Sequence, residues 1–305
     1  MDADDANWVE AFLSHLVNER RMSRHTVAAY RHDLASLASF CKRRGVSAWA
    51  QLDHHLVRAF AAAEHAAGLA PRSVQRRLSA ARTFFNYLAR ESNCDRNPAL
   101  EVRAPKPKKR LPMTLDADQM GRLLAFRVED SISMRDKAIM ELFYSSGLRL
   151  SELVGLNVRE LDLADRTVRV LGKGGKTRIV PVGRYAVEAL RQWLAERAQL
   201  LKRSKLEAQE SALFLGPRGR RLAARAVQLR VALWARRQGI GMKLHPHMFR
   251  HSFATHLLES SGNLRGVQEL LGHADIGTTQ IYTHLDFQHL ASVYDAAHPR
   301  ARRRS

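Results

Sequence analysis

A proline-rich basic segment at residues 97–112 constrains the fold of this chain more than any other feature. It holds four prolines and five basic residues among its sixteen positions. Proline fixes φ and lacks a backbone N–H donor, so this density excludes the interior of a helix or a sheet. We predict a semi-extended linker at residues 96–113. It separates a domain at residues 1–95 from a second domain at residues 114–298, which a basic tail at residues 299–305 follows.

The chain is strongly basic. Its 305 residues include 50 Lys and Arg against 30 Asp and Glu, a formal net charge of +20, and its 45% of hydrophobic residues is typical of a folded protein. This length is ample for two domains with separate cores. The excess charge favours a polyanionic partner, because each basic side chain that meets a phosphate releases condensed counterions. Charge that serves only solubility is the alternative.

The cysteines and the apolar runs exclude several classes of protein. Cys41 and Cys94 are too few for a disulfide framework, and the chain has no Cys-x-x-Cys motif. It also lacks a charge-free apolar run of about 18 residues, and its first residues are acidic where a signal peptide would be basic. We therefore expect a cytoplasmic protein with neither membrane insertion nor an export signal.

The first domain is predicted to be helical throughout. Apolar residues recur at three- and four-residue spacing over residues 6–93. Ser23 is expected to cap one helix, and another is expected to begin near Pro71. The second of these helices has an apolar face, with Arg72 and Arg76 on the opposite side.

These basic residues are candidates for binding DNA. A cationic helix face with an apolar back suits a helix laid against DNA, although a merely solvated basic face is the alternative. The charges of the linker would follow a phosphate backbone, unless the linker is an ordinary spacer. The candidate DNA-binding residues are Arg72, Arg76, Lys106, Lys108, Lys109 and Arg110.

The second domain shows a mixed α and β pattern. A helix is expected at residues 133–144, ended by the residues up to Gly147, and another helix follows Ser151. Two strands are predicted at residues 168–171 and 178–182, with a glycine-rich turn between them at residues 172–177. The remainder is mainly helical. The chain as a whole is thus expected to be mainly α with a small β-sheet, in two domains.

The glycine-rich turn is not a nucleotide-binding loop. Gly175, Lys176 and Thr177 resemble the end of a phosphate loop, but such a loop needs glycine where this chain has Val170. The turn also lies between two strands, not between a strand and a helix. What remains is a hairpin tip on which a flexible lysine, Lys173, can reach into a groove or an active site.

Four histidines, at positions 245, 247, 251 and 256, lie close together in the sequence but do not indicate a metal site. Zinc would need a compact ligand set, and the spacing from His251 to His256 places these two side chains on different helical faces. His247 and Arg250, three residues apart, are neighbours on one face. A cation beside a histidine favours an oxyanion, so no metal is expected.

Five motifs together resemble one family. They are Gly147-Leu148-Arg149-Leu150-Ser151-Glu152, Gly172-Lys173-Gly174, His247-x-x-Arg250-His251, Leu271-Gly272-His273 and Tyr282. Each motif is weak alone, but their order and separations are similar to those of the tyrosine site-specific recombinases, the phage integrase family. The resemblance covers essentially the whole chain, and the stretch at residues 270–302 is most similar to the branch that resolves bacterial chromosome dimers.

The resemblance implies a reaction in which Tyr282 attacks a DNA phosphodiester and forms a 3′-phosphotyrosyl link with a free 5′-hydroxyl. Arg149 and Arg250 would clamp the phosphate, because their planar forks suit a developing oxyanion. A mobile ammonium on Lys173 would protonate the leaving group. Since the bond energy is stored in the phosphotyrosine, the resemblance implies no cofactor, neither ATP nor a metal.

Two histidines complete the implied catalytic set, and one glutamate is assigned a supporting part. The phenol has a pKa near 10 and needs a base or a cationic field, so His247 is taken as the base and His273 as a second phosphate contact. Glu152, three residues after Arg149, would orient its neighbours, unless it is an ordinary exposed helix acid.

The resemblance also implies a fold and partners. The fold would be an all-helical SAM-like core-binding domain and a mixed α+β catalytic domain, which clamp double-stranded DNA. The implied partners are a dif-like DNA site, a XerD-like recombinase in a heterotetramer and an FtsK-like translocase as activator, at the nucleoid. The alternatives are a type IB topoisomerase, which uses similar chemistry, and a non-catalytic DNA-binding protein with the same fold.

The chain departs from the family pattern at two positions. Phe249 stands where leucine is usual, which is a swap between apolar residues of similar volume. Gly277 stands where serine is more common and is expected to loosen the segment that carries Tyr282.

Overall fold

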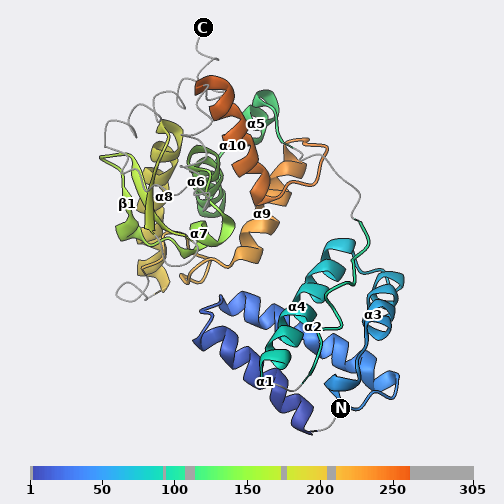
Figure 1. Ribbon diagram of the computed structural model, residues 1–305. Helices are drawn as coiled ribbons and strands as arrows, with labels where there is room; N and C mark the ends of the chain where they lie inside the picture. The colour runs from blue at the N-terminus through green and yellow to red at the C-terminus, as the bar shows by residue number, and fades with distance from the viewer. Residues whose placement is uncertain (1–2, 92–93, 107–113, 173–176, 205–210, 262–305) are drawn as a thin grey trace. The chain divides into compact units, whose positions relative to one another are not determined.

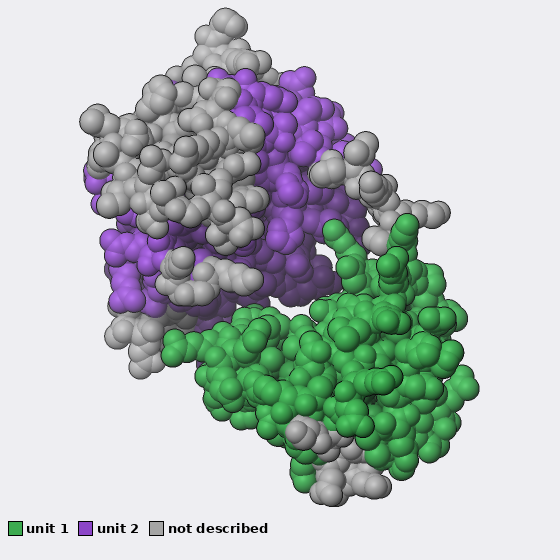
Figure 2. Space-filling view, in the orientation of Figure 1, with its two compact units in different colours: residues 1–110 green, residues 111–305 purple. Residues whose placement is uncertain are grey.

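The computed structural model describes residues 3–91, 94–106, 114–172, 177–204 and 211–261. The chain divides into two compact units, residues 1–110 and residues 111–305 (Figure 1, Figure 2). Each unit has its own hydrophobic core. Within the described residues, no helix combines the length and apolar character needed to cross a membrane.

The first unit is a bundle of helices. Its elements are α1 (Ala3–Asn18), α2 (Arg24–Arg43), the 3-10 helix η1 (Trp49–Gln51), α3 (His54–Ala66) and α4 (Pro71–Arg90). The hydroxyl of Ser23 accepts a hydrogen bond from the Thr26 amide and so caps α2, as predicted. Pro71 occupies the first turn of α4, where its missing N–H costs nothing, so that prediction is also confirmed.

Helix α4 is central to the core of the first unit. It buries Val74, Leu78 and Phe85, at helical spacing, and packs against α1, α2 and α3. Residues 97–102 also pack on this unit, because Ala99 and Val102 are buried. Arg82 on α4 donates from Nε to the Ala99 carbonyl at 2.9 Å and from Nη2 to the Val102 carbonyl at 2.6 Å. Residues 97–102, the first part of the proline-rich segment, are therefore anchored along α4.

The second unit combines helices with a small sheet. Its helices are α5 (Ala117–Leu124), α6 (Ser131–Ser146), α7 (Leu150–Gly155), the 3-10 helix η2 (Val158–Glu160), α8 (Arg184–Ser204), α9 (Ala224–Arg237) and α10 (Pro246–Ser261). The strands are β1 (Leu161–Asp162), β2 (Thr167–Leu171) and β3 (Thr177–Pro181), antiparallel in the order β1-β2-β3. The predicted helix before Gly147 and both predicted strands are confirmed. Strand β1 has only two residues and was not expected.

Helix α6 forms the centre of the second unit (Figure 1). It is buried on nearly all sides and packs against α5, α8, α9 and α10. Tyr144 in its last turn shares a 2.8 Å hydrogen bond with Nδ1 of His256 on α10. Phe143 stacks on Phe249 of α10 with ring centroids 5.8 Å apart, so the phenylalanine at position 249 serves the core.

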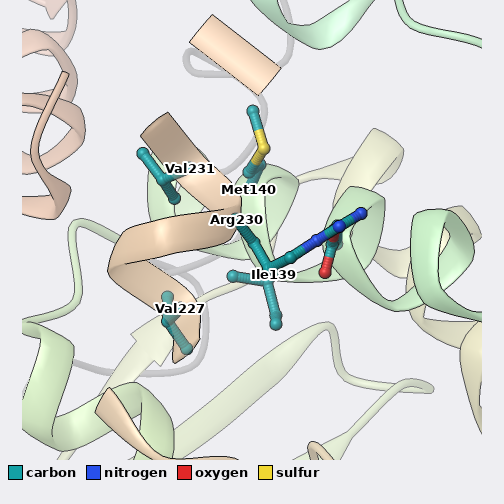
Figure 3. A pocket seen from close by; sticks show the side chains of 6 residues that line it. Ile139, Met140, Val227, Arg230 and Val231 are labelled. Carbon is teal, nitrogen blue, oxygen red and sulfur yellow. The ribbon is translucent and has the colours of Figure 1, made fainter. Parts of the chain in front are cut away.

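A buried carboxylate joins α6 to α9. Asp136 is 1% exposed and accepts hydrogen bonds from Arg135, from Arg230 and from the indole of Trp234, the last at 2.9 Å. The hollow beside it, between α6 and α9, is lined by Ile139, Met140, Val227, Arg230 and Val231 (Figure 3). Side chains fill this hollow, so it is a packing contact between the two helices and not a ligand pocket.

Asp136→Ala is expected to lower the free energy of unfolding of the second unit by about 3–5 kcal/mol, because two arginines would lose their buried counter-charge. Asp118→Ala, which removes an exposed carboxylate from α5, is the control and is expected to change it by less than about 0.5 kcal/mol. Thermal unfolding measures the loss, and hydrogen exchange of peptides from α6 and α9 locates it. Unchanged protection of these peptides in the Asp136 variant would contradict the structural role.

Candidate active site

The turn between α6 and α7 brings Arg149 and Glu152 together. Gly147 ends α6 in the left-handed region, with φ 56° and ψ 32°, where a side chain would be strained. Arg149 then occupies the N-cap position of α7. The carboxylate of Glu152, in the first turn, accepts the Arg149 amide at 2.8 Å, as in a capping box. The local sequence therefore fixes this pair without help from distant residues.

The carboxylate of Glu152 is the centre of a cluster of arginines. The guanidinium of Arg149 donates from Nη1 to Oε1 at 2.9 Å. Arg178, from β3, donates from Nη1 to Oε1 at 2.8 Å and from Nη2 to Oε2 at 3.0 Å. The side chain of Glu152 is only 4% exposed. Glu152 is therefore a buried acceptor, and its reading as an ordinary exposed helix acid is wrong.

Arg250 completes the cluster from α10. It is buried, and its Nη1 donates to the Gly147 carbonyl at 2.6 Å, at the turn that precedes Arg149. Burial, together with the neighbouring Arg149 and Arg178 and against the opposing charge of Glu152, lowers the pKa of Arg250 to about 10. Arg250 stays protonated at neutral pH. Three guanidinium groups around one carboxylate leave a formal excess of two positive charges, which suits a phosphate.

Glu152 remains ionised at neutral pH. Burial by itself would raise its pKa, but hydrogen bonds from Arg178 and Arg149 outweigh burial and lower the pKa to about 2. The carboxyl of the unfolded chain takes up its proton near pH 4.5, and that of the folded chain only near pH 2. The contribution of Glu152 to stability is therefore complete above about pH 4.5 and is lost as the pH falls toward 2.

Glu152→Gln tests whether the stabilisation by Glu152 is lost as the pH falls. The neutral amide has no proton to take up, so the variant lacks this contribution at every pH. We expect the difference in free energy of unfolding between the wild type and this variant to shrink by about 2 kcal/mol between pH 7 and pH 3. Urea unfolding of both proteins at pH 7 and at pH 3 measures this difference. A difference that stays constant would contradict a carboxylate held ionised by arginines.

The structure accounts for only some of the other predicted site residues. His247 is exposed on α10, three residues before Arg250 and so one turn away from it. Lys173, His273 and Tyr282 lie outside the described residues, as does Gly277. Over the part of the chain that is described, no group of three His, Cys, Asp or Glu side chains is arranged to hold a metal ion.

The candidate DNA-binding residues differ in their surroundings. Arg72 and Lys106 are exposed. The side chain of Arg76 is 43% exposed, but its guanidinium pairs with the buried carboxylate of Asp33 on α2. Lys108, Lys109 and Arg110 lie outside the described residues. Arg76 thus has a structural contact within the bundle as well as an outward surface.

Arg178 is the residue of the cluster that the sequence analysis missed. Strand β3 alternates, so Arg178 shares the inward face with Val180 and lies opposite Val170 of β2. An arginine at an inward strand position requires a buried partner of opposite charge. This alternation is the signal that could have identified Arg178, although only the fold shows that its partner is Glu152.

Comparisons with known proteins cover nearly the whole chain. Residues 113–289 match the model of the Phage integrase family, and residues 9–92 match that of the Phage integrase N-terminal SAM-like domain. The chain is 58% identical over 297 residues to the tyrosine recombinase XerC of Azotobacter vinelandii, with 97% of each chain covered. It is 55% identical over 296 residues to XerC of Pseudomonas fluorescens, again with 97% of each covered.

A solved structure shows a similar fold. The XerH site-specific recombinase, crystallised with palindromic difH substrate as a post-cleavage complex, is 24% identical, with a TM-score of 0.68. The match covers 90% of this chain and 80% of that one. The predicted architecture, mainly α with a small sheet and with SAM-like and catalytic domains, is thereby confirmed.

Proposed function

From the premise that the chain belongs to the tyrosine recombinases of the phage integrase family, as its five motifs predicted, we propose that it resolves chromosome dimers. It would act at a dif-like site, together with a XerD-like partner, during chromosome segregation and cell division. Membership of the family makes the chain an enzyme that cuts and rejoins DNA. The site, the partner and the cellular task are the proposed part, and the high identity to XerC proteins supports them.

The arginine cluster around Glu152 is the observation that carries the proposed chemistry. Cleavage of a phosphodiester places negative charge on the non-bridging oxygens. Arg149 and Arg250 supply two guanidinium groups close to each other, with Arg149 the more exposed. Both are cationic before DNA arrives, so little reorganisation is needed when the charge develops.

The proposed reaction is a transesterification. The phenolic oxygen of Tyr282 attacks phosphorus while the bond to the 5′ oxygen breaks. The phenolic proton passes to His247, and Lys173 gives a proton to the departing 5′ oxygen. His273 adds a second contact to the phosphate. Attack by the 5′-hydroxyl of another strand on the phosphotyrosine then reverses these transfers and completes the exchange.

The remaining charge of the chain would bind DNA without reading its sequence. The proposed phosphate contacts, whose binding would depend steeply on salt, are Arg72, Arg76, Lys106 and the linker cations Lys108, Lys109 and Arg110. Two domains on a basic linker can enclose a duplex. A heterotetramer with the XerD-like partner would hold two such duplexes, with an FtsK-like translocase as activator at the nucleoid.

Covalent trapping on dif half-sites tests the proposed function. Each half-site is offered as a nicked suicide duplex, with and without the XerD-like partner from the same organism. We expect a covalent protein–DNA product on one half-site only, increased by the partner. Equal trapping on unrelated DNA would contradict a dif-like target.

A plasmid assay separates recombination from topoisomerase activity. Supercoiled plasmid with paired dif-like sites is expected to give recombinant product in the presence of the partner. Efficient relaxation of a plasmid that lacks these sites, with no recombinant product from either plasmid, would contradict the proposal and favour a type IB topoisomerase.

A further inference from the structure

The guanidinium of Arg178 binds Glu152 more completely than the guanidinium of Arg149 does. Two nitrogens of Arg178 reach the two carboxylate oxygens, at 2.8 and 3.0 Å, in the fork geometry that suits a carboxylate. Arg149 reaches the carboxylate with one guanidinium nitrogen, at 2.9 Å. The negative charge of Glu152 is therefore matched chiefly by Arg178.

The two arginines also differ in exposure. The side chain of Arg149 is 37% exposed, and that of Arg178 is 17% exposed. A DNA phosphate arrives from solvent, so Arg149 presents the more accessible guanidinium. Arg178 lies on the inner side of the carboxylate, where its effect on a phosphate passes through Glu152.

The sheet fixes the position of Arg178. It stands opposite Val170 in the register of β2 and β3, on the face that also carries the buried Val180. At the end of the same strand, the hydroxyl of Ser146 donates to the Pro181 carbonyl at 2.7 Å. This bond joins β3 to the last turn of α6, directly before the turn that leads to Arg149. Arg178 is thus held in place by the protein itself.

The charge balance of the cluster depends on Arg178. With Arg178 paired to Glu152, the charges of Arg149 and Arg250 remain as the formal excess of two. Without Arg178, the excess would fall to one, and Glu152 would draw the Arg149 guanidinium onto both of its oxygens. That would turn Arg149 away from solvent and cancel its charge.

We propose that Arg178 is a positioning residue for DNA cleavage: it binds both oxygens of Glu152, holds that carboxylate in place and keeps the Arg149 guanidinium available for the scissile phosphate. This inference rests on the proposed function, and it extends that function to a residue outside the five sequence motifs.

Cleavage rates at saturating protein test the proposal. Arg178→Gln is expected to slow covalent trapping on a suicide duplex about 10- to 100-fold, as loss of a residue that orients a functional group typically does. The affinity for DNA is expected to change less than about threefold, because the Arg178 side chain is only 17% exposed. Arg169→Gln is the matched control: it removes an arginine from the exposed face of the same sheet and is expected to change the rate less than about threefold.

A double-mutant cycle distinguishes positioning from a general structural role. If Arg178 acts through Arg149, Arg178→Gln adds little to Arg149→Ala, and the double variant cleaves within about threefold of the single Arg149 variant. If the two losses multiply in full, Arg178 acts independently of Arg149 and the proposal is overturned. If Arg178→Gln does not fold, Arg178→Lys takes its place, with an expected loss of about 10-fold, because lysine keeps the charge but not the fork.

A modified substrate distinguishes an effect on the phosphate from an effect on the leaving group. A 5′-bridging phosphorothiolate supplies a leaving group that needs no protonation. The Arg178→Gln defect is expected to persist on this substrate, and its rescue would overturn action through Arg149. The outcomes also separate the two claims: a wild-type rate for Arg178→Gln refutes only this inference, whereas absence of any covalent product from the wild type refutes the proposed function and this inference with it.

Discussion

Tyr282→Phe is expected to abolish covalent trapping, with the rate of cleavage reduced by at least about 10⁴-fold. Phenylalanine lacks the oxygen that attacks phosphorus, so no phosphotyrosyl bond can form. The variant should still bind the same DNA, because the hydroxyl is a small part of the interface. The measurement is a denaturing gel of labelled suicide duplex after incubation with each protein.

Tyr294→Phe is the matched control, since it removes a tyrosine hydroxyl from the same C-terminal stretch. It is expected to trap DNA at a rate within about threefold of the wild type. Covalent product from the Tyr282 variant would mean that another residue is the nucleophile.

Arg250→Ala is expected to give the second largest effect, a loss of about 10²- to 10³-fold in cleavage at saturating protein. The variant removes one of the two guanidinium groups assigned to the phosphate. It also removes the donor to the Gly147 carbonyl, so the turn that presents Arg149 should loosen. Cleavage is measured well below the unfolding temperature, so that lost stability does not lower the rate.

Two further variants define the contribution of Arg250. Arg250→Lys keeps a positive charge without the fork and is expected to recover only part of the loss. Arg236→Ala removes an exposed arginine from α9 and is the control for net charge, with little expected effect on the rate at saturation. Cleavage by Arg250→Ala within about threefold of the wild type would remove Arg250 from the proposed site.

Much of the fold is predictable from the sequence because it depends on local signals. Ser23 caps a helix with its own hydroxyl, Pro71 begins one, and Gly147 ends one in a conformation that favours glycine. The alternation of valines on either side of a glycine-rich turn predicts the β2–β3 hairpin. Each of these signals lies within a few residues of its effect.

The contacts that complete the site are not local and could not be predicted in the same way. Arg149 and Glu152 are three residues apart, but Arg178 and Arg250 reach them from β3 and α10. The helical spacing predicts that Arg76 lies on the cationic face of α4. Its pairing with Asp33, in contrast, depends on how α2 packs on α4. Spacing in the sequence indicates which face a side chain occupies, and only the packing of elements decides what it meets.

Identification of the residue bound to DNA shows whether Tyr282 is the nucleophile. The wild-type protein is trapped on a suicide duplex, both components are digested, and the nucleotide-bearing peptide is sequenced by mass spectrometry. We expect a single 3′-phosphate adduct on Tyr282. An adduct on any other residue, or a 5′-phosphate link, would contradict it.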